Sequence, residues 1–220
     1  EQWRPDDRYR QAAGEGRIGF DLGVPGPSDV GVVDGILVAL VPSALPRPED
    51  HETLARNRAW LLSMENEIVS LFYDTLYAYP PTSGVFVEGE RSDREQTLRV
   101  WWQRTVGSPI DKEYFRWMAF VGIVHIKRGV KNPMMLSMLQ VVSDHVVVVA
   151  RVALGEAEAV KLQQAFARIG ATVGSIISEA YTTGYVGALE DLAGLDPKLT
   201  ARMLAMEVKR LEQEGRAQLG

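Results

Sequence analysis

Most of the fold information lies in Tyr114-Phe-Arg-Trp-Met-Ala-Phe-Val-Gly-Ile-Val-His125-Ile-Lys-Arg-Gly129-Val-Lys-Asn-Pro133. One helical face of this stretch holds Tyr114, Trp117, Met118, Val121 and His125, which follow the spacing i, i+3, i+4, i+7 and i+11. Gly129 suits the left-handed conformation that follows a helix end, and Pro133 prevents simple continuation of the helix. The stretch therefore predicts a hydrophobic helix that turns His125 toward a core.

An imidazole at this position has two ordinary uses. It can ligate a metal through one nitrogen while the other nitrogen donates to a carbonyl of the preceding turn. It can also be a hydrogen-bonded core residue without a ligand, which is the commoner role of a lone histidine on an apolar face. Helix spacing alone leaves both interpretations open for His125.

The composition restricts the class of protein. The 220 residues are 46% hydrophobic and 24% charged, which suits one domain with appendages. A net charge of −5 without a long basic run argues against nucleic-acid binding. The absence of cysteine excludes disulfides, thiolate metal sites and cysteine nucleophiles. The apolar stretch near the start, residues 36–45, is too short to span a bilayer. We expect a cytoplasmic protein with no nucleic-acid or membrane partner.

The chain divides into an irregular beginning and a helical remainder. Residues 1–48 hold seven glycines and six prolines, which predicts a mostly irregular extension with a short helix around Ile36–Leu40. The remaining sequence predicts an all-α chain, with residues 49–194 as one domain and 195–220 as a C-terminal helix or connector. The expected helices are 50–79, ending at Pro80-Pro81; one capped by Ser92 with Glu95; one capped by Asp111 that carries His125; 134–153; 157–193; and one beginning at Asp196-Pro197.

Three motifs in order resemble a known family. They are Phe72-Tyr73 before a proline, Gln96-Thr97-Leu98, and Val121-Gly-Ile-Val-His125-Ile-Lys-Arg-Gly129. Their order and gaps are similar to those of the haem-binding globin domain of globin-coupled sensors and protoglobins. The resemblance covers about residues 50–193 and implies a globin-like fold of the sensor type. It also implies haem b, bound without a covalent link because the chain has no cysteine.

The resemblance implies a role for each of several residues. His125 is then the proximal haem ligand and the metal ligand, and Tyr73 is the distal tyrosine that hydrogen-bonds a bound gas. Thr97 adds a second distal hydroxyl. Trp101, on the same helical face, forms a pocket wall, and Phe72 adjoins Tyr73. Lys127 and Arg128 follow the ligand as candidate partners of the haem propionates.

Each of these residues also has a simpler interpretation. Tyr73 can be a core tyrosine whose hydroxyl reaches a carbonyl. Thr97 can bond its own helix backbone. Lys127 and Arg128 can be charges at a helix end. One departure from the family pattern is that Met134 and Met135 stand where sensor globins commonly have an aromatic pair.

The function that the resemblance implies is reversible binding of a diatomic gas, O₂ first, with CO and NO as further ligands. A homodimer through helices 134–153 and 157–193 is implied as well, and residues 1–48 are expected to cover a haem edge or ligand route. Gly170, Gly174 and Ser178 form a row that suits either internal packing or a dimer seam. A haem-dependent enzyme, such as an NO dioxygenase or peroxidase, and a haem-free interaction protein remain as alternatives. We expect a gas-binding or sensing protein rather than an enzyme.

Overall fold

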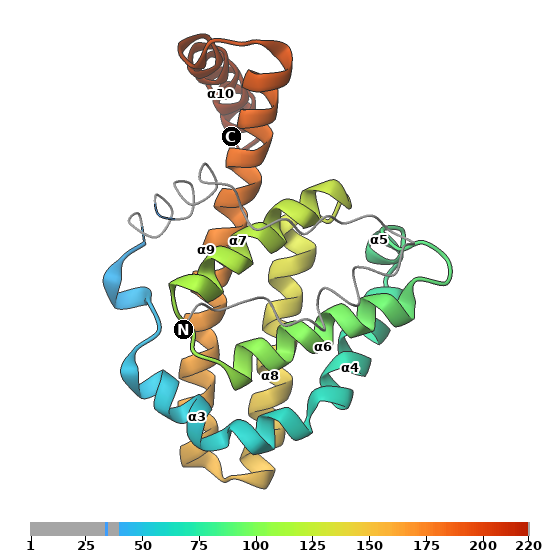
Figure 1. Cartoon of the computed structure of the whole chain (residues 1–220). Helices are drawn as coiled ribbons and strands as arrows, with labels where there is room; N and C mark the ends of the chain where they lie inside the picture. Colours follow the sequence, from blue (N-terminus) through green and yellow to red (C-terminus); the bar gives the residue numbers. More distant parts are fainter. Residues whose placement is uncertain (1–33, 35–39, 220) are drawn as a thin grey trace.

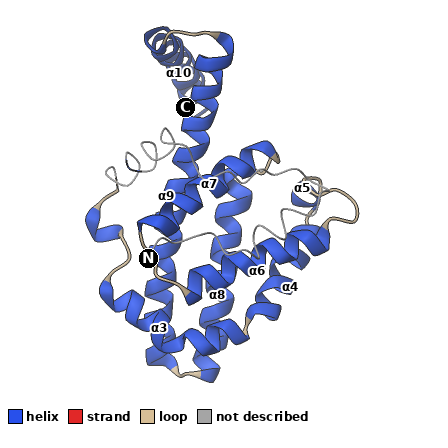
Figure 2. Ribbon diagram, in the orientation of Figure 1, coloured by secondary structure: helices blue, strands red, loops and turns tan. Residues whose placement is uncertain are grey.

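The structure is a computed structural model that describes residue 34 and residues 40–219, and all regular elements in that part are helical (Figure 1, Figure 2). The all-α prediction is therefore confirmed. The short helix expected around Ile36–Leu40, and most of the 1–48 extension, lie outside the described residues. The elements are η1 (Pro42–Ala44), α3 (Pro48–Ser63), α4 (Glu65–Ala78), α5 (Pro80–Ser83), α6 (Arg91–Gly107), α7 (Lys112–Lys127), α8 (Asn132–Ala153), α9 (Glu156–Ala193) and α10 (Pro197–Leu219).

The first predicted helix is a bent pair. Met64 separates α3 from α4, with its backbone at φ −80° and ψ −2°. Pro80 starts the short helix α5 at its first position, where a missing N–H costs no helical hydrogen bond. The prolines therefore end α4 and begin a further turn of helix.

The predicted cap of α6 is wrong. Ser92 lies inside the helix, which begins at Arg91 with Glu90 as its N-cap. The Glu90 carboxylate accepts a hydrogen bond from the Val87 N–H at 2.8 Å, so the turn before α6 is closed by this side chain. The spacing of Ser92 and Glu95 could not reveal this bond, because Val87 lies in the turn before the helix.

The predicted ends of α7 are confirmed. The Asp111 carboxylate accepts from the Tyr114 N–H at 2.9 Å, which satisfies one of the free donors of the first turn. Gly129 has φ +68°, and its N–H donates to the Ile126 carbonyl at 3.0 Å. Asp196 caps α10 in the same way, accepting from the Lys198 N–H at 2.8 Å.

The helix α9 organises the molecule. It has 38 residues, and α3, α7 and α8 all pack along it (Figure 1). Trp102 of α6 is completely buried in the main core, and its indole N–H donates to the Leu61 carbonyl at 2.9 Å. A smaller buried cluster lies beside the main core and consists of Val69, Tyr73, Leu76, Leu98 and Met138.

The helix α8 is apolar and long enough, by length and composition, to cross a membrane. It packs on α9 and α4, and one third of its most apolar window is buried. The helices α8 and α9 pack closely at Gly174 of α9, since a Cβ there would lie 2.7 Å from Leu136 Cδ2. Of the two uses left open for the small-residue row, Gly174 therefore serves internal packing. Val148 and Val152 of α8 remain exposed.

Candidate functional site

His125 lies near the end of α7 with one ring nitrogen engaged. Its Nδ1 is 2.6 Å from the Val121 carbonyl one turn earlier. Because a carbonyl only accepts, Nδ1 carries the proton, and in the neutral ring the Nε2 lone pair is left for a metal. Burial lowers the pKa of His125, outweighing the opposite effect of the Val121 bond, and the Arg128 charge lowers it further. The imidazole is thus held neutral, the form that ligates metals.

Two glycines fix how closely α7 lies on α9. A Cβ at Gly122 would lie 3.1 Å from Ala180 Cβ and 3.3 Å from Ile177 Cα. On the opposite helix, a Cβ at Gly184 would lie 2.9 Å from Ile126 Cδ1. The two contacts flank His125 in sequence on α7, so the helix that carries the imidazole is docked tightly on both sides of it.

Tyr73 is buried in α4 with 6% of its surface exposed. Its hydroxyl donates to the Arg94 carbonyl of α6 at 2.6 Å, and its ring makes an edge contact with Phe86 at 6.0 Å between centroids. Burial raises its pKa, so the phenol remains a neutral donor. The single hydroxyl proton is therefore donated to the Arg94 carbonyl, as the core-tyrosine interpretation expects, and the distal role requires the hydroxyl to leave this acceptor.

The remaining distal candidates differ in their surroundings. Thr97 is exposed and its hydroxyl donates to the Asp93 carbonyl at 3.0 Å, the backbone-bonded alternative. The structure therefore does not join the Thr97 and Tyr73 hydroxyls by a hydrogen bond. Trp101, one turn later, and Phe72 are both partly buried and pack against both core clusters. The roles of these residues toward a ligand remain predictions.

The two cations after the ligand also differ. Lys127 is exposed, whereas Arg128 is partly buried and forms an ion pair with Glu90 at 2.5 Å. Glu90 also forms an ion pair with Arg94, at 3.4 Å. Sequence reasoning missed both Glu90 and Arg94. Their i, i+4 spacing was the available signal, but many exposed pairs share it.

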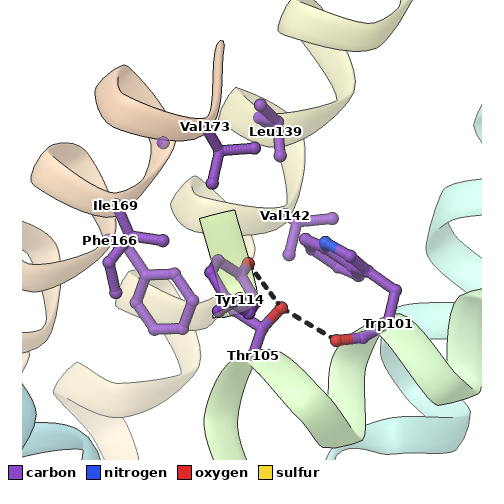
Figure 3. Close-up of a pocket in the computed structure, with 9 residues that line it drawn as sticks. Trp101, Thr105, Tyr114, Leu139, Val142, Phe166, Ile169 and Val173 are labelled. Carbon is purple, nitrogen blue, oxygen red and sulfur yellow. Dashed lines mark hydrogen bonds between the residues drawn. The ribbon is translucent and has the colours of Figure 1, made fainter. Parts of the chain in front are cut away.

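A small apolar cavity lies between α6, α7, α8 and α9 (Figure 3). The Thr105 hydroxyl, in its wall, donates to the Trp101 carbonyl at 2.8 Å and lies 2.9 Å from the Tyr114 hydroxyl. These polar groups therefore satisfy each other, and the rest of the lining is apolar. The other residues around the cavity are Leu139, Val142, Phe166, Ile169, Gly170 and Val173.

The donor set fits a haem group. His125 offers a neutral, oriented nitrogen, and Tyr73 offers a buried neutral hydroxyl, which are the two polar functions that a globin pocket needs. The apolar cavity beside Trp101 is lined by neither His125 nor Tyr73. The helical fold and these two donors fit the class of globin-type haem proteins.

Comparison with known families gives the same class. The family model described as Protoglobin matches residues 47–186, well over half of the chain. The chain therefore belongs to the protoglobin family, which confirms the predicted fold and makes it a globin-type protein that binds haem and a gas. A search of curated proteins found no match.

Proposed function

We propose that this protein is a sensor-type globin that reversibly binds a diatomic gas, O₂ first and also CO or NO, at haem b held by His125. The observation that carries the proposal is the Nδ1 hydrogen bond to the Val121 carbonyl together with the lowered pKa of His125. A core histidine needs a partner for one nitrogen only, but a neutral ring so oriented also offers its other nitrogen as a ligand.

Each residue of the proposed site has a separate task. The haem iron, when bound, supplies the open coordination position at which a gas attaches. His125 would hold the iron, and its bond to Val121 fixes the ring orientation and increases its basicity. The Tyr73 hydroxyl would donate a hydrogen bond to the bound gas, and this would favour O₂ because bound O₂ carries partial negative charge.

The propionates need cationic or hydrogen-bonding partners at the edge of the pocket. Lys127 and Arg128 follow His125 directly and are the proposed partners. Lys127 is exposed. Arg128 already contacts Glu90, so it would share its guanidinium between two carboxylates.

We also propose a cytoplasmic homodimer in which α8 and α9 of two copies pack together. Val148 and Val152 of α8 are 59% and 90% exposed, and Leu189 of α9 is 54% exposed. Apolar side chains of this size on the two longest core helices favour a helical interface.

Reversible gas binding is tested with the reconstituted ferrous protein. O₂ is added and removed in cycles under a visible spectrum, and NO is then added to the O₂-bound form. Repeated return to the deoxy spectrum supports the proposal. Oxidation on the first exposure to O₂ would contradict reversible binding. Sustained turnover of NO would favour the enzymatic alternative.

A further inference from the structure

Glu90 is a buried carboxylate that joins three segments of the chain. It is 7% exposed and stands at the N-cap of α6. One oxygen, Oε1, accepts from the Val87 N–H at 2.8 Å and from the Arg128 guanidinium at 2.5 Å. The other, Oε2, lies 3.4 Å from Arg94 Nε. A buried charge is costly unless all its partners stay in place, so Glu90 fixes these three neighbours relative to one another.

The same neighbours hold Tyr73. Its hydroxyl donates to the backbone carbonyl of Arg94, and its ring packs against Phe86, the residue before Val87. The Arg94 carbonyl, which accepts from the hydroxyl, belongs to a residue that Glu90 contacts. Phe86, which packs on the ring, is bonded to Val87, which Glu90 also contacts. The position of Tyr73 depends on Glu90 although the two side chains share no hydrogen bond.

Arg128 connects this cluster to the helix of His125. Its backbone N–H donates to the His125 carbonyl at 3.1 Å, while its side chain reaches Glu90. The chain thus provides one route of contacts from the end of α7, through Glu90, to the hydroxyl of Tyr73.

We propose that Glu90 is a positioning residue for Tyr73, and that its ion pair with Arg128 favours the hydrogen bond of the Tyr73 hydroxyl to the Arg94 carbonyl, which competes with and weakens its hydrogen bond to a bound gas. The proposal rests on the proposed function, because it takes a bound gas to be the acceptor that competes with the Arg94 carbonyl for the Tyr73 hydroxyl. Loosening the pair frees the first turn of α6, releases the hydroxyl from Arg94, and makes it a better donor to the ligand.

The first test measures O₂ dissociation from the haem-loaded protein by stopped flow. Glu90→Gln and Arg128→Gln should each slow dissociation about fivefold, the effect of strengthening one hydrogen bond. Glu113→Gln is the matched control, because it removes an ion-paired carboxylate at the start of α7 that is exposed and pairs with Arg116. The control should stay within about twofold. Unchanged or faster dissociation in both test variants would overturn the proposal.

A Tyr73→Phe background shows whether the effect passes through the tyrosine. Without the hydroxyl, Glu90→Gln should cause no further change in O₂ dissociation. A change of the same size in this background would overturn the assignment to Tyr73. If Glu90→Gln fails to fold by circular dichroism, Arg128→Gln carries the test, since Arg128 lies at a helix end.

The second test needs no haem. The full chain is made with tyrosine labelled at the ζ carbon, and Tyr73→Phe identifies the Tyr73 NMR signal. Glu90→Gln and Arg128→Gln should shift this signal, and Glu113→Gln should leave it in place. A shift in a protein that binds no gas would refute the proposed function and keep the positioning role. Normal gas binding without a shift would refute the positioning role alone.

Discussion

His125 and Tyr73 respond to burial in opposite directions for one reason. Loss of water disfavours the charged form, so the pKa of the imidazole falls and the pKa of the phenol rises. Both side chains are therefore neutral near pH 7. His125 then offers a lone pair and Tyr73 a proton, which are the functions that ligand binding on the two sides of a haem requires.

The distal role of Tyr73 predicts the result of a single substitution. Tyr73→Phe should keep haem and speed O₂ dissociation about fivefold, because one net hydrogen bond of about 1 kcal/mol is lost. Tyr77→Phe is the control, since Tyr77 lies one turn away on α4 and stacks on Phe86 at 4.7 Å between centroids. Stopped-flow measurement of both variants checks the prediction, and equal rates for Tyr73→Phe and the parent would count against the distal role.

The lowered pKa of His125 predicts how the haem-free protein responds to acid. A group whose folded pKa lies below its unfolded value contributes stability above the unfolded pKa of about 6.5, and this is lost as pH falls below that value toward the folded pKa. The free energy of unfolding should therefore fall more between pH 8 and pH 5 in the parent than in His125→Gln. Urea titrations at both pH values measure the free energy of unfolding. An equal decrease in the parent and in His125→Gln would contradict the burial of a neutral imidazole.

For single residues, the sequence predicted some environments and not others. The helix-end position of His125 and the cap at Asp111 follow from local spacing, and the structure has them. Glu90 could not be found this way, because its partners come from segments that only tertiary structure brings together. Thr97 is on the predicted helix, but its exposure depends on how α6 rotates against α4.

The helix α7 lies close to the backbone of α9 at Gly122. Gly122→Ala would bring a methyl group within 3.3 Å of the Ile177 backbone, which cannot move as a side-chain tip can. We expect a loss of about 1–3 kcal/mol in the free energy of unfolding, together with weaker haem retention because α7 is displaced.

Gly170→Ala is the matched control for this substitution. Gly170 also lies in a helix interior, but a Cβ there would meet nothing within 4 Å. Alanine should therefore raise the free energy of unfolding by about 0.5–1 kcal/mol. Chemical unfolding of both variants decides the matter, and a loss of similar size in both would show that close packing at Gly122 is not the cause.

The extents of the helices were largely predictable from periodicity and from glycine and proline. The 134–153 and 157–193 predictions differ from α8 and α9 by one or two residues at the N-terminal ends. The break at Met64 was not located in advance, because no glycine or proline marks it. It separates α3, which packs on α9, from α4, which packs on α8.

For the whole molecule, the exposed apolar side chains of α8 and α9 predict self-association. Val148→Glu should weaken the dimer by at least about tenfold, because burying an unpaired carboxylate costs more than about 1.4 kcal/mol. Val41→Glu is the control, at a position with a similar exposed fraction outside both helices. Analytical ultracentrifugation measures the dissociation constants, and a monomeric parent would contradict the proposed homodimer.

Ligation of haem iron by His125 can be tested with the visible spectrum of the haem-reconstituted protein beside that of His125→Ala. His145→Ala is the control, since His145 lies on α8 and its Nε2 is 2.7 Å from a carboxylate oxygen of Glu67 on α4. We expect a strong Soret band in the parent and in His145→Ala, and its loss or shift in His125→Ala. A parent that takes up no stoichiometric haem, or a band unchanged in His125→Ala, would contradict it.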